Sequence, residues 1–163
     1  MLLYSTDTPA PAIVEVYTDR STGNRSLFSK TAFGVDEIIS SFYWTAVYPV
    51  PTYLTVQIGE AAHISLLPSF LACINHSCQP NSFFDTGQKQ LVCIKPIRSG
   101  EEITFFYPSS EWSMDRPFDC SCAGPSCLKR IAGAKYLAPD ELERYRFTPF
   151  IQKKLATIYG LSS

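Results

Sequence analysis

The sequence lacks the features that mark a membrane protein or a nucleic-acid-binding protein. Its 163 residues contain no apolar run near the roughly 18 residues that a membrane-spanning helix requires. The net charge is −1, and no segment has the strong basic excess typical of nucleic-acid-binding domains. Charged residues make up 18% of the chain and hydrophobic residues 45%, which is enough apolar material for the core of one domain. We therefore expect neither membrane insertion nor direct nucleic-acid binding.

The start of the chain also lacks the basic region of a secretory signal. Residues 1–12 contain scattered apolar residues and end in a proline-rich stretch. No internal repeat or low-complexity tract follows. We therefore expect an intracellular protein, nuclear or cytoplasmic, and disulfides are rare in those compartments.

Short β-branched or alternating segments dominate the first two thirds of the chain. Such segments, separated by turn residues, predict a mainly β domain. One short helix is expected among them, because Pro68 suits a first helical turn. The expected strands are residues 12–17, 26–29, 38–43, 54–58, 90–95 and 103–107, and the expected helix is residues 65–74.

The sequence changes character after Pro108. Residues 108–127 are rich in Ser, Pro, Asp and Cys and have little periodicity, so they predict a loop-rich region. Proline and acidic residues at 138–143 are typical of a helix start, and residues 147–159 before Gly160 predict a final helix. We expect this tail to pack on its own body, with a dimer contact as the alternative, so that the protein is a monomer or a weak dimer.

Three of the six cysteines form a Cys-x-Cys-x4-Cys motif: Cys120, Cys122 and Cys127. Thiols at this spacing in a loop can converge on one tetrahedral ion, and zinc requires four such ligands. Cys78, which lies on a separate polar loop, is the best candidate for the fourth. Disulfides are the alternative, but an intracellular location and the strained geometry of a Cys-x-Cys pair disfavour them. We therefore predict one structural zinc ion.

The run from Asn75 to Cys78 places an amide, an imidazole, a hydroxyl and a thiol at consecutive positions. A proline-containing turn follows, so the run is a poor helix and a poor strand and indicates a shaped loop. Side chains of this kind in a loop commonly bind or catalyse. The alternative is a polar turn with a stray cysteine.

Three motifs follow one another in the chain. Asn-His-Ser-Cys-Gln-Pro-Asn at 75–81 precedes Gly-Glu-Glu-Ile-Thr-Phe-Phe-Tyr at 100–107, and the Cys-x-Cys-x4-Cys motif comes last. In this order the chain resembles the SET-domain lysine methyltransferases that carry a zinc-binding post-SET segment. The resemblance covers about residues 12–131.

The resemblance implies a mainly β fold of small curved sheets, in which the Asn-His-Ser-Cys segment passes under a loop to form a pseudoknot. It also implies that the cysteine of this segment joins the three post-SET cysteines on one zinc ion, in agreement with the choice of Cys78. The implied parts of the chain are a SET domain over residues 1–112, a post-SET segment over 113–133 and a C-terminal helical extension over 134–163.

The activity implied is methyl transfer from S-adenosylmethionine to the nitrogen of a protein lysine. Tyr107 matches the central catalytic tyrosine of the family and also lies against the cofactor. Asn75 and His76 match the pair that binds the cofactor. The other cofactor positions implied by the resemblance are Arg25, Ser26, Leu27 and Ile131.

Phenylalanines occupy three positions that line the amine channel in the family, namely Phe42, Phe84 and Phe105. A narrow aromatic channel disfavours a charged ammonium group and lowers its pKa, so that a neutral amine can attack. With phenylalanine at 84 and 105, the resemblance favours di- or trimethylation. The alternative is that Phe84 and Phe105 are ordinary core residues on strands.

Two departures from the family pattern leave the function open. Asn24, Arg25 and Ser26 replace the Gly-x-Gly of the cofactor loop, which makes close backbone approach harder. Phe42 stands where many members carry a tyrosine. We therefore retain three hypotheses: a protein-lysine N-methyltransferase with a histone or non-histone substrate, a non-catalytic binding module, and a SET-scaffold enzyme that acts on a small molecule.

Overall fold

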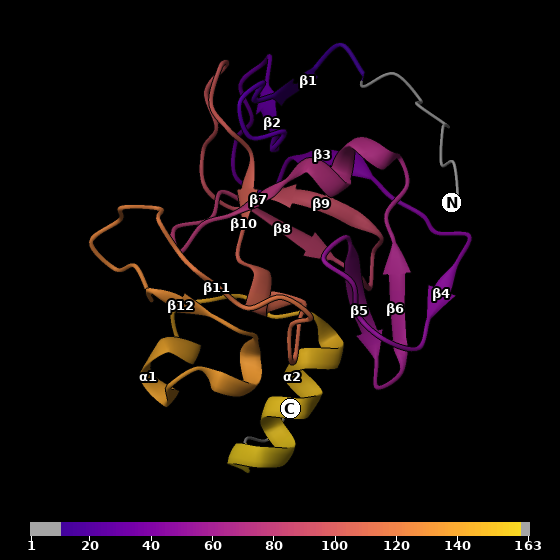
Figure 1. Ribbon diagram of the computed structural model, residues 1–163, viewed down its shortest axis with the longest axis vertical. Coiled ribbons are helices and arrows are strands. Elements are labelled where there is room, and N and C mark those ends of the chain that lie inside the picture. The colour runs from indigo at the N-terminus through magenta and orange to yellow at the C-terminus, as the bar shows by residue number, and fades with distance from the viewer. Residues whose placement is uncertain (1–10, 161–163) are drawn as a thin grey trace.

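Short strands form four small sheets in the computed structural model, which describes residues 11–160 (Figure 1). This confirms the predicted mainly β fold. Residues 1–10, where we looked for a signal sequence, and residues 161–163 of the tail lie outside the described residues. The strands are β1 (Val14–Thr18), β2 (Arg25–Ser29), β3 (Ile38–Ser41), β4 (Val47–Tyr48), β5 (Thr55–Gly59), β6 (Ala62–Ser65), β7 (Asn75–His76), β8 (Ser82–Asp85), β9 (Gln90–Cys93), β10 (Thr104–Phe105), β11 (Phe118–Asp119) and β12 (Arg130–Ile131). The helices are η1 (Ser69–Cys73), η2 (Tyr107–Ser109), η3 (Ala134–Tyr136), α1 (Pro139–Leu142) and α2 (Pro149–Tyr159), where η denotes a 3-10 helix.

The central sheet has the strand order β3-β9-β8-β10-β7, and β10 runs parallel to both of its neighbours. Because β10 lies between β7 and β8, the connection of residues 77–81 between those two strands must cross β10. This crossing is the topology expected of the predicted pseudoknot. It also places Asn75 opposite Thr104 and His76 opposite Phe105 in the register of β7 and β10.

The predicted helix over residues 65–74 is wrong in length and type. The structure has a five-residue 3-10 helix, η1, and Pro68 is its N-cap rather than part of its first turn. Strand β6 (Ala62–Ser65), which the sequence analysis missed, pairs with β5 immediately before it.

The predicted strand over residues 103–107 is too long, because β10 ends at Phe105. Tyr107 begins η2, and Pro108 occupies the second position of that helix. Proline has no N–H to donate to a strand ladder, which accounts for the early end of the strand. Tyr107 therefore lies on a turn beyond the sheet.

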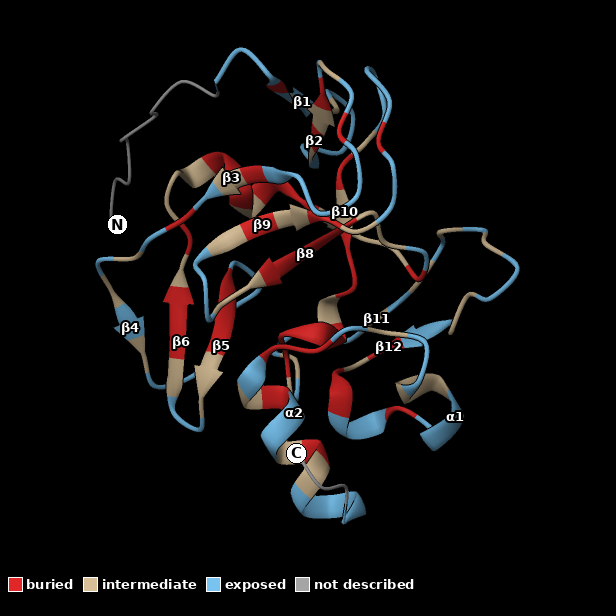
Figure 2. Cartoon of the chain, turned by 180° about the vertical axis from the view of Figure 1, so that it is seen from behind, coloured by how far each residue is buried: buried red, intermediate tan, exposed pale blue. Residues whose placement is uncertain are grey.

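Two hydrophobic clusters hold these elements together. Figure 2 shows buried residues along β5, β6 and β8 and in part of α2. The larger cluster fills the space between the small sheets and includes Phe84 and Leu91, which face each other across β8 and β9 and are fully buried. The smaller one joins Phe106 to the tail through Ile151 and Leu155 of α2. The prediction that the tail packs on its own body is therefore confirmed.

The described part of the tail contains short helices, of which α2 buries one face. Its longest helix, α2, has 11 residues, and only Ile151 and Leu155 of that helix are buried. Among residues 11–160, no helix has both the length and the apolar character needed to cross a bilayer.

Gly133 marks the entry to the tail and has a φ of 124°, which disfavours any residue with a side chain. A Cβ atom here would collide with the backbone of Trp112. The next N–H groups, of Ala134 and Lys135, donate to the carbonyl oxygens of Glu111 (2.8 Å) and Trp112 (3.1 Å). The tail thus fixes the backbone of residues 111–112.

Replacing Ile151 by alanine tests the packing of the tail. Ile151 is completely buried, so we expect Ile151→Ala to lower the free energy of unfolding by about 2–5 kcal/mol. Ile158→Ala on the same helix is the matched control, because Ile158 is 57% exposed and should change stability far less. Denaturant unfolding of the two variants makes the comparison, and equal losses would contradict the packing described.

Candidate active site

The side chain of Asn75 joins β7 to β2. Its amide nitrogen lies 3.0 Å from the carbonyl oxygen of Arg25, 2.9 Å from the hydroxyl of Ser26 and 3.0 Å from a carboxylate oxygen of Glu102. Leu27, the next residue of β2, is fully buried in the core, and its carbonyl oxygen accepts the N–H of Ile103. Three of the residues predicted to bind the cofactor, Arg25, Ser26 and Asn75, therefore meet here, whereas the side chain of Leu27 points into the core.

His76 connects that edge to Tyr107. Its Nδ1 accepts the backbone N–H of Tyr107 at 3.2 Å, and its Nε2 lies 3.3 Å from the Sγ of Cys78. The ring also contacts the rings of Phe106 and Phe118. Burial lowers the pKa of His76 to about 4, so the imidazole is neutral at physiological pH and can accept this N–H.

The Tyr107 hydroxyl donates to the carbonyl oxygen of Ile74 at 3.1 Å. Burial raises the pKa of Tyr107 to about 12, so the hydroxyl stays protonated and can keep this hydrogen bond at neutral pH. Phe118, whose ring centroid lies 5.9 Å from that of Tyr107, pairs with Ile131 in the β11–β12 ribbon. Ile131 is buried on that ribbon and makes no pair with β2 or β7.

The predicted channel residues form a continuous chain of aromatic contacts. Ring centroids lie 5.7 Å apart for Phe42 and Phe84, 4.8 Å for Phe84 and Phe105, and 4.7 Å for Phe105 and Tyr107. Phe42 and Phe84 are buried in the larger core. Tyr43, the residue after Phe42, carries a hydroxyl but is 56% exposed.

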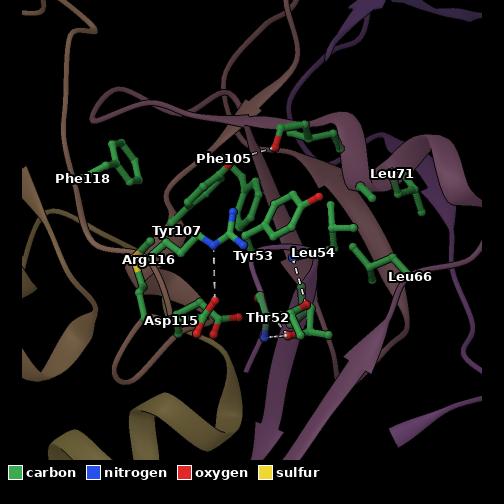
Figure 3. Close-up of a pocket in the computed structure, with 16 residues that line it drawn as sticks. Thr52, Tyr53, Leu54, Leu66, Leu71, Phe105, Tyr107, Asp115, Arg116 and Phe118 are labelled. Carbon is green, nitrogen blue, oxygen red and sulfur yellow. Dashed lines mark hydrogen bonds and ion pairs between the residues drawn. The ribbon is translucent and has the colours of Figure 1, made fainter. Parts of the chain in front are cut away.

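A cavity of about 160 Å³ lies beside Phe105 and Tyr107 (Figure 3). It is similar in size to engineered protein cavities of about 150 Å³ that hold one benzene molecule. Phe42 and Phe84 lie behind its wall and do not line it, so their contact with a substrate stays a prediction. The lining residues are mostly apolar or aromatic and comprise residues 52–56, Leu66, Leu71, Ala72, Ile74, Phe105, Tyr107, Glu111, residues 114–116 and Phe118.

Charged and aromatic side chains form one side of this cavity. The guanidinium group of Arg116 lies 4.6 Å from the centre of the Tyr53 ring, and its Nε lies 3.6 Å from Asp115. Figure 3 shows Arg116 and Tyr53 beside Tyr107, with Asp115 next to Arg116. Tyr53, Asp115 and Arg116 are exposed, so the cavity has a polar rim and an apolar interior.

Glu111 is the one carboxyl group that lines the cavity and is itself buried, with 7% of its surface exposed. One of its oxygens, Oε1, accepts the backbone N–H of Gln57 at 3.1 Å. Burial raises its pKa from the ordinary 4.5 to about 8, although the Gln57 N–H opposes this shift. No motif in the sequence singles out Glu111, whose only signal there is its position four residues after Tyr107.

The raised pKa predicts how stability depends on pH. Between about pH 4.5 and pH 8 the folded protein holds a proton on Glu111 that the unfolded chain has lost, so the stability contributed by this group falls as pH rises. Glu111→Gln keeps an oxygen for the Gln57 N–H but cannot ionise. We expect the free energy of unfolding of this variant, relative to the wild type, to rise between pH 5 and pH 9 by up to about 4 kcal/mol.

Denaturant unfolding across this pH range measures the difference, with the exposed Glu143→Gln as a control that should follow the wild type. If the difference in free energy of unfolding between Glu111→Gln and the wild type is the same at all pH values, folding does not shift the pKa of Glu111 and the prediction is wrong.

The four predicted zinc ligands come together in one cluster. The Sγ atoms of Cys78, Cys120, Cys122 and Cys127 all lie within 4.8 Å of one another, and those of Cys78 and Cys120 are 3.9 Å apart. Four thiolates around one zinc ion at about 2.3 Å would be separated by about 3.8 Å. Burial raises the pKa of the Cys78 thiol, so a thiolate there requires a neighbouring cation. The cluster therefore fits a zinc ion.

We expect metal analysis to find one zinc ion per chain in freshly purified protein. Cys120→Ser should lose the ion and much of the folding stability that depends on it. Cys73→Ala is the control and should keep the ion, because Cys73 is a buried thiol of the larger core. Wild-type protein without zinc, or full zinc content in Cys120→Ser, would contradict the assignment.

Comparisons with known proteins agree with this geometry. The family model described as SET domain matches residues 13–108. Methyltransferase flvH of Aspergillus flavus is 34% identical over 148 residues, which are 90% of this chain and 83% of that protein. Histone-lysine N-methyltransferase set9 of Schizosaccharomyces pombe is 39% identical over 67 residues, which are 39% of this chain and 14% of that protein.

A solved structure has a similar fold. KRYPTONITE in complex with mCHG DNA and SAH matches 72% of this chain and 28% of its own chain, with a TM-score of 0.56 and 21% sequence identity. At this identity the likeness concerns the fold.

Proposed function

This chain belongs to the SET-domain family, and from that premise we propose that it is an S-adenosylmethionine-dependent N-methyltransferase that acts on the amine of a protein lysine. One observation carries the proposal. His76 accepts the backbone N–H of Tyr107, whose side chain lines a largely apolar cavity, and the neighbouring Asn75 contacts Arg25 and Ser26, although these segments lie about 30 to 50 residues apart in the chain. A binding module without catalysis would have no need for this combination.

The cofactor would lie against the edge that Asn75 joins to β2. The carbonyl oxygen of Arg25, the hydroxyl of Ser26 and the amide of Asn75 are grouped there, and Asn75 and His76 are both partly exposed. These hydrogen-bonding groups fit a ligand that has amino, carboxylate and hydroxyl groups. S-Adenosylmethionine, when bound, supplies the methyl group as part of a sulfonium ion. We assign Leu27 and Ile131 to the same site as apolar contacts.

Tyr107 would align the acceptor amine with that methyl group. Its hydroxyl is fixed by the Ile74 carbonyl, and both groups offer oxygen atoms to polarised methyl C–H bonds. The apolar and aromatic lining beside Tyr107 disfavours a charged ammonium group there, so the amine would attack in its neutral form, after it has lost a proton. Much of the rate enhancement would then come from alignment of the two reactants.

The zinc ion would have a structural role, since all four of its positions are taken by thiolates. It would link the loop of residues 77–81, through Cys78, to the segment of residues 113–133. That segment supplies Phe118 and Arg116 to the cavity, so zinc would hold one wall in place. In this proposal residues 1–112 form the catalytic domain and residues 134–163 support it.

The acceptor is a protein lysine in our first proposal and a small-molecule amine in our second. The relatives named as histone-lysine methyltransferases, such as set9, support the first, and with it a location in the nucleus or cytoplasm. The second is favoured because flvH, the relative that matches 90% of this chain, is named only as a methyltransferase. DNA is bound to KRYPTONITE in its solved complex. We propose no nucleic-acid contact for this chain.

Calorimetry with S-adenosylmethionine tests the proposed class of enzyme. Transfer of labelled methyl groups to lysate proteins or to small amines tests the identity of the acceptor.

The Tyr107→Phe variant should bind the cofactor as the wild type does but lose methyltransferase activity by on the order of 100-fold, since it removes one positioned hydroxyl. Tyr43→Phe, which removes an exposed hydroxyl, should keep full activity. If the zinc-loaded protein does not bind the cofactor, the proposal fails.

A further inference from the structure

The Glu111 carboxyl group is held rigidly at the wall of the cavity that contains Tyr107. Its Oε1 accepts the N–H of Gln57 from β5, and its backbone carbonyl accepts the N–H of Ala134. Gln57 in turn accepts the N–H of Trp112 through its own side-chain oxygen at 3.0 Å. Glu111 is thus fixed from both sides and has little freedom to turn away from the cavity.

One oxygen of this carboxyl group has no partner of its own. Among residues 11–160, no donor forms a hydrogen bond to Oε2, and no Lys, Arg or His forms an ion pair with Glu111. Arg116, the cation that lines the same cavity, is instead paired with Asp115 and stacked on Tyr53. A buried carboxylate without a cation is costly, so the site is suited to a ligand that brings a positive charge.

We propose that Glu111 binds the primary ammonium group of the substrate through Oε2 and takes one proton from it. This assignment rests on the proposed methyltransferase function and identifies the substrate as a primary amine that enters as a cation. In the proton transfer, an N–H bond of the ammonium group breaks and an O–H bond forms on Oε2. The nitrogen lone pair is then free for attack, and the positive charge has been neutralised within the cavity.

The environment of Glu111 makes this transfer easier than it would be in water. A lysine amine has a pKa of about 10.4, so an ordinary glutamate would be a weaker base by about six powers of ten. In the cavity without a ligand, burial raises the pKa of Glu111 to about 8, which makes it a stronger base than an ordinary glutamate. The other titratable or charged groups around it are Tyr53, Tyr107, Asp115 and Arg116 of the cavity and His63, which pairs with Gln57 across β5 and β6.

Glu111→Gln tests the charge of this group without removing its structural hydrogen bond, because the amide oxygen can still accept the Gln57 N–H. The probe is n-butylamine, titrated into the full-length, zinc-loaded protein and followed by NMR. At about pH 8.5 we expect the variant to bind the amine at least about tenfold more weakly, since it lacks a charge-assisted hydrogen bond. The affinity of the wild type should rise up to about pH 8 and then level off, and the variant should show no such break.

Two controls isolate the effect of the charge. 1-Butanol has a similar size and no charge, so both proteins should bind it equally if the cavity is intact. Glu143→Gln removes an exposed carboxylate and should bind n-butylamine as the wild type does. Equal amine affinity in the wild type and Glu111→Gln, or the same break near pH 8 in both, would overturn the assignment.

One further measurement distinguishes a protein lysine from a small free amine as the substrate. A second distinguishes the proposed role of Glu111 from the proposed methyltransferase function. Nα-Acetyl-lysine methylamide should bind at least as well as n-butylamine if the substrate is a protein lysine, and should be excluded if the substrate is a small free amine. S-Adenosylhomocysteine binding, measured by calorimetry on the same proteins, reports on the proposed function alone. If the protein binds this compound but Glu111→Gln has no effect on amine affinity, only the role of Glu111 is refuted.

Discussion

The hydrogen bond from the Tyr107 backbone N–H to Nδ1 of His76 joins the parts of the candidate active site. It exists because β10 runs parallel to β7 and places Phe105 opposite His76, so that the chain leaving β10 passes over the imidazole ring. The same ring is 3.3 Å from Cys78 on its other side, and the neighbouring Asn75 contacts β2. The proposed cofactor edge, the tyrosine and the metal cluster therefore depend on one strand crossing.

Burial favours the neutral form of three titratable side chains in the candidate active site. It lowers the pKa of His76 to about 4 and raises those of Tyr107 and Glu111 to about 12 and about 8. In each case the loss of hydration favours the neutral form. His76 is therefore a hydrogen-bond acceptor and Tyr107 a donor at neutral pH. Glu111 differs from them because its pKa lies close enough to physiological pH for the group to exchange a proton.

The C-terminal tail contributes to the site from outside it. The ring of Tyr145 stacks on Phe106 at a centroid distance of 3.6 Å, and its hydroxyl donates to the carbonyl oxygen of Cys78 at 2.9 Å. The residues after Gly133 hold the backbone of Glu111 and Trp112. The tail, which packs on the body through buried apolar residues, thus supports both the cysteine cluster and the cavity wall.

The local sequence determined the positions of the strands that have clear alternation or β-branched residues, and of the final helix before Gly160. It also identified the four cysteines of the cluster. These features depend on residue types and their spacing along the chain. The local sequence also indicated the motif that contains Asn75, His76 and Cys78. Only the tertiary structure decided that Phe105 lines the cavity while Phe42 and Phe84 lie behind it. Only the tertiary structure revealed Glu111, whose partner Gln57 is 54 residues away. Burial and desolvation arise when distant segments pack together, and no local pattern in the sequence records them.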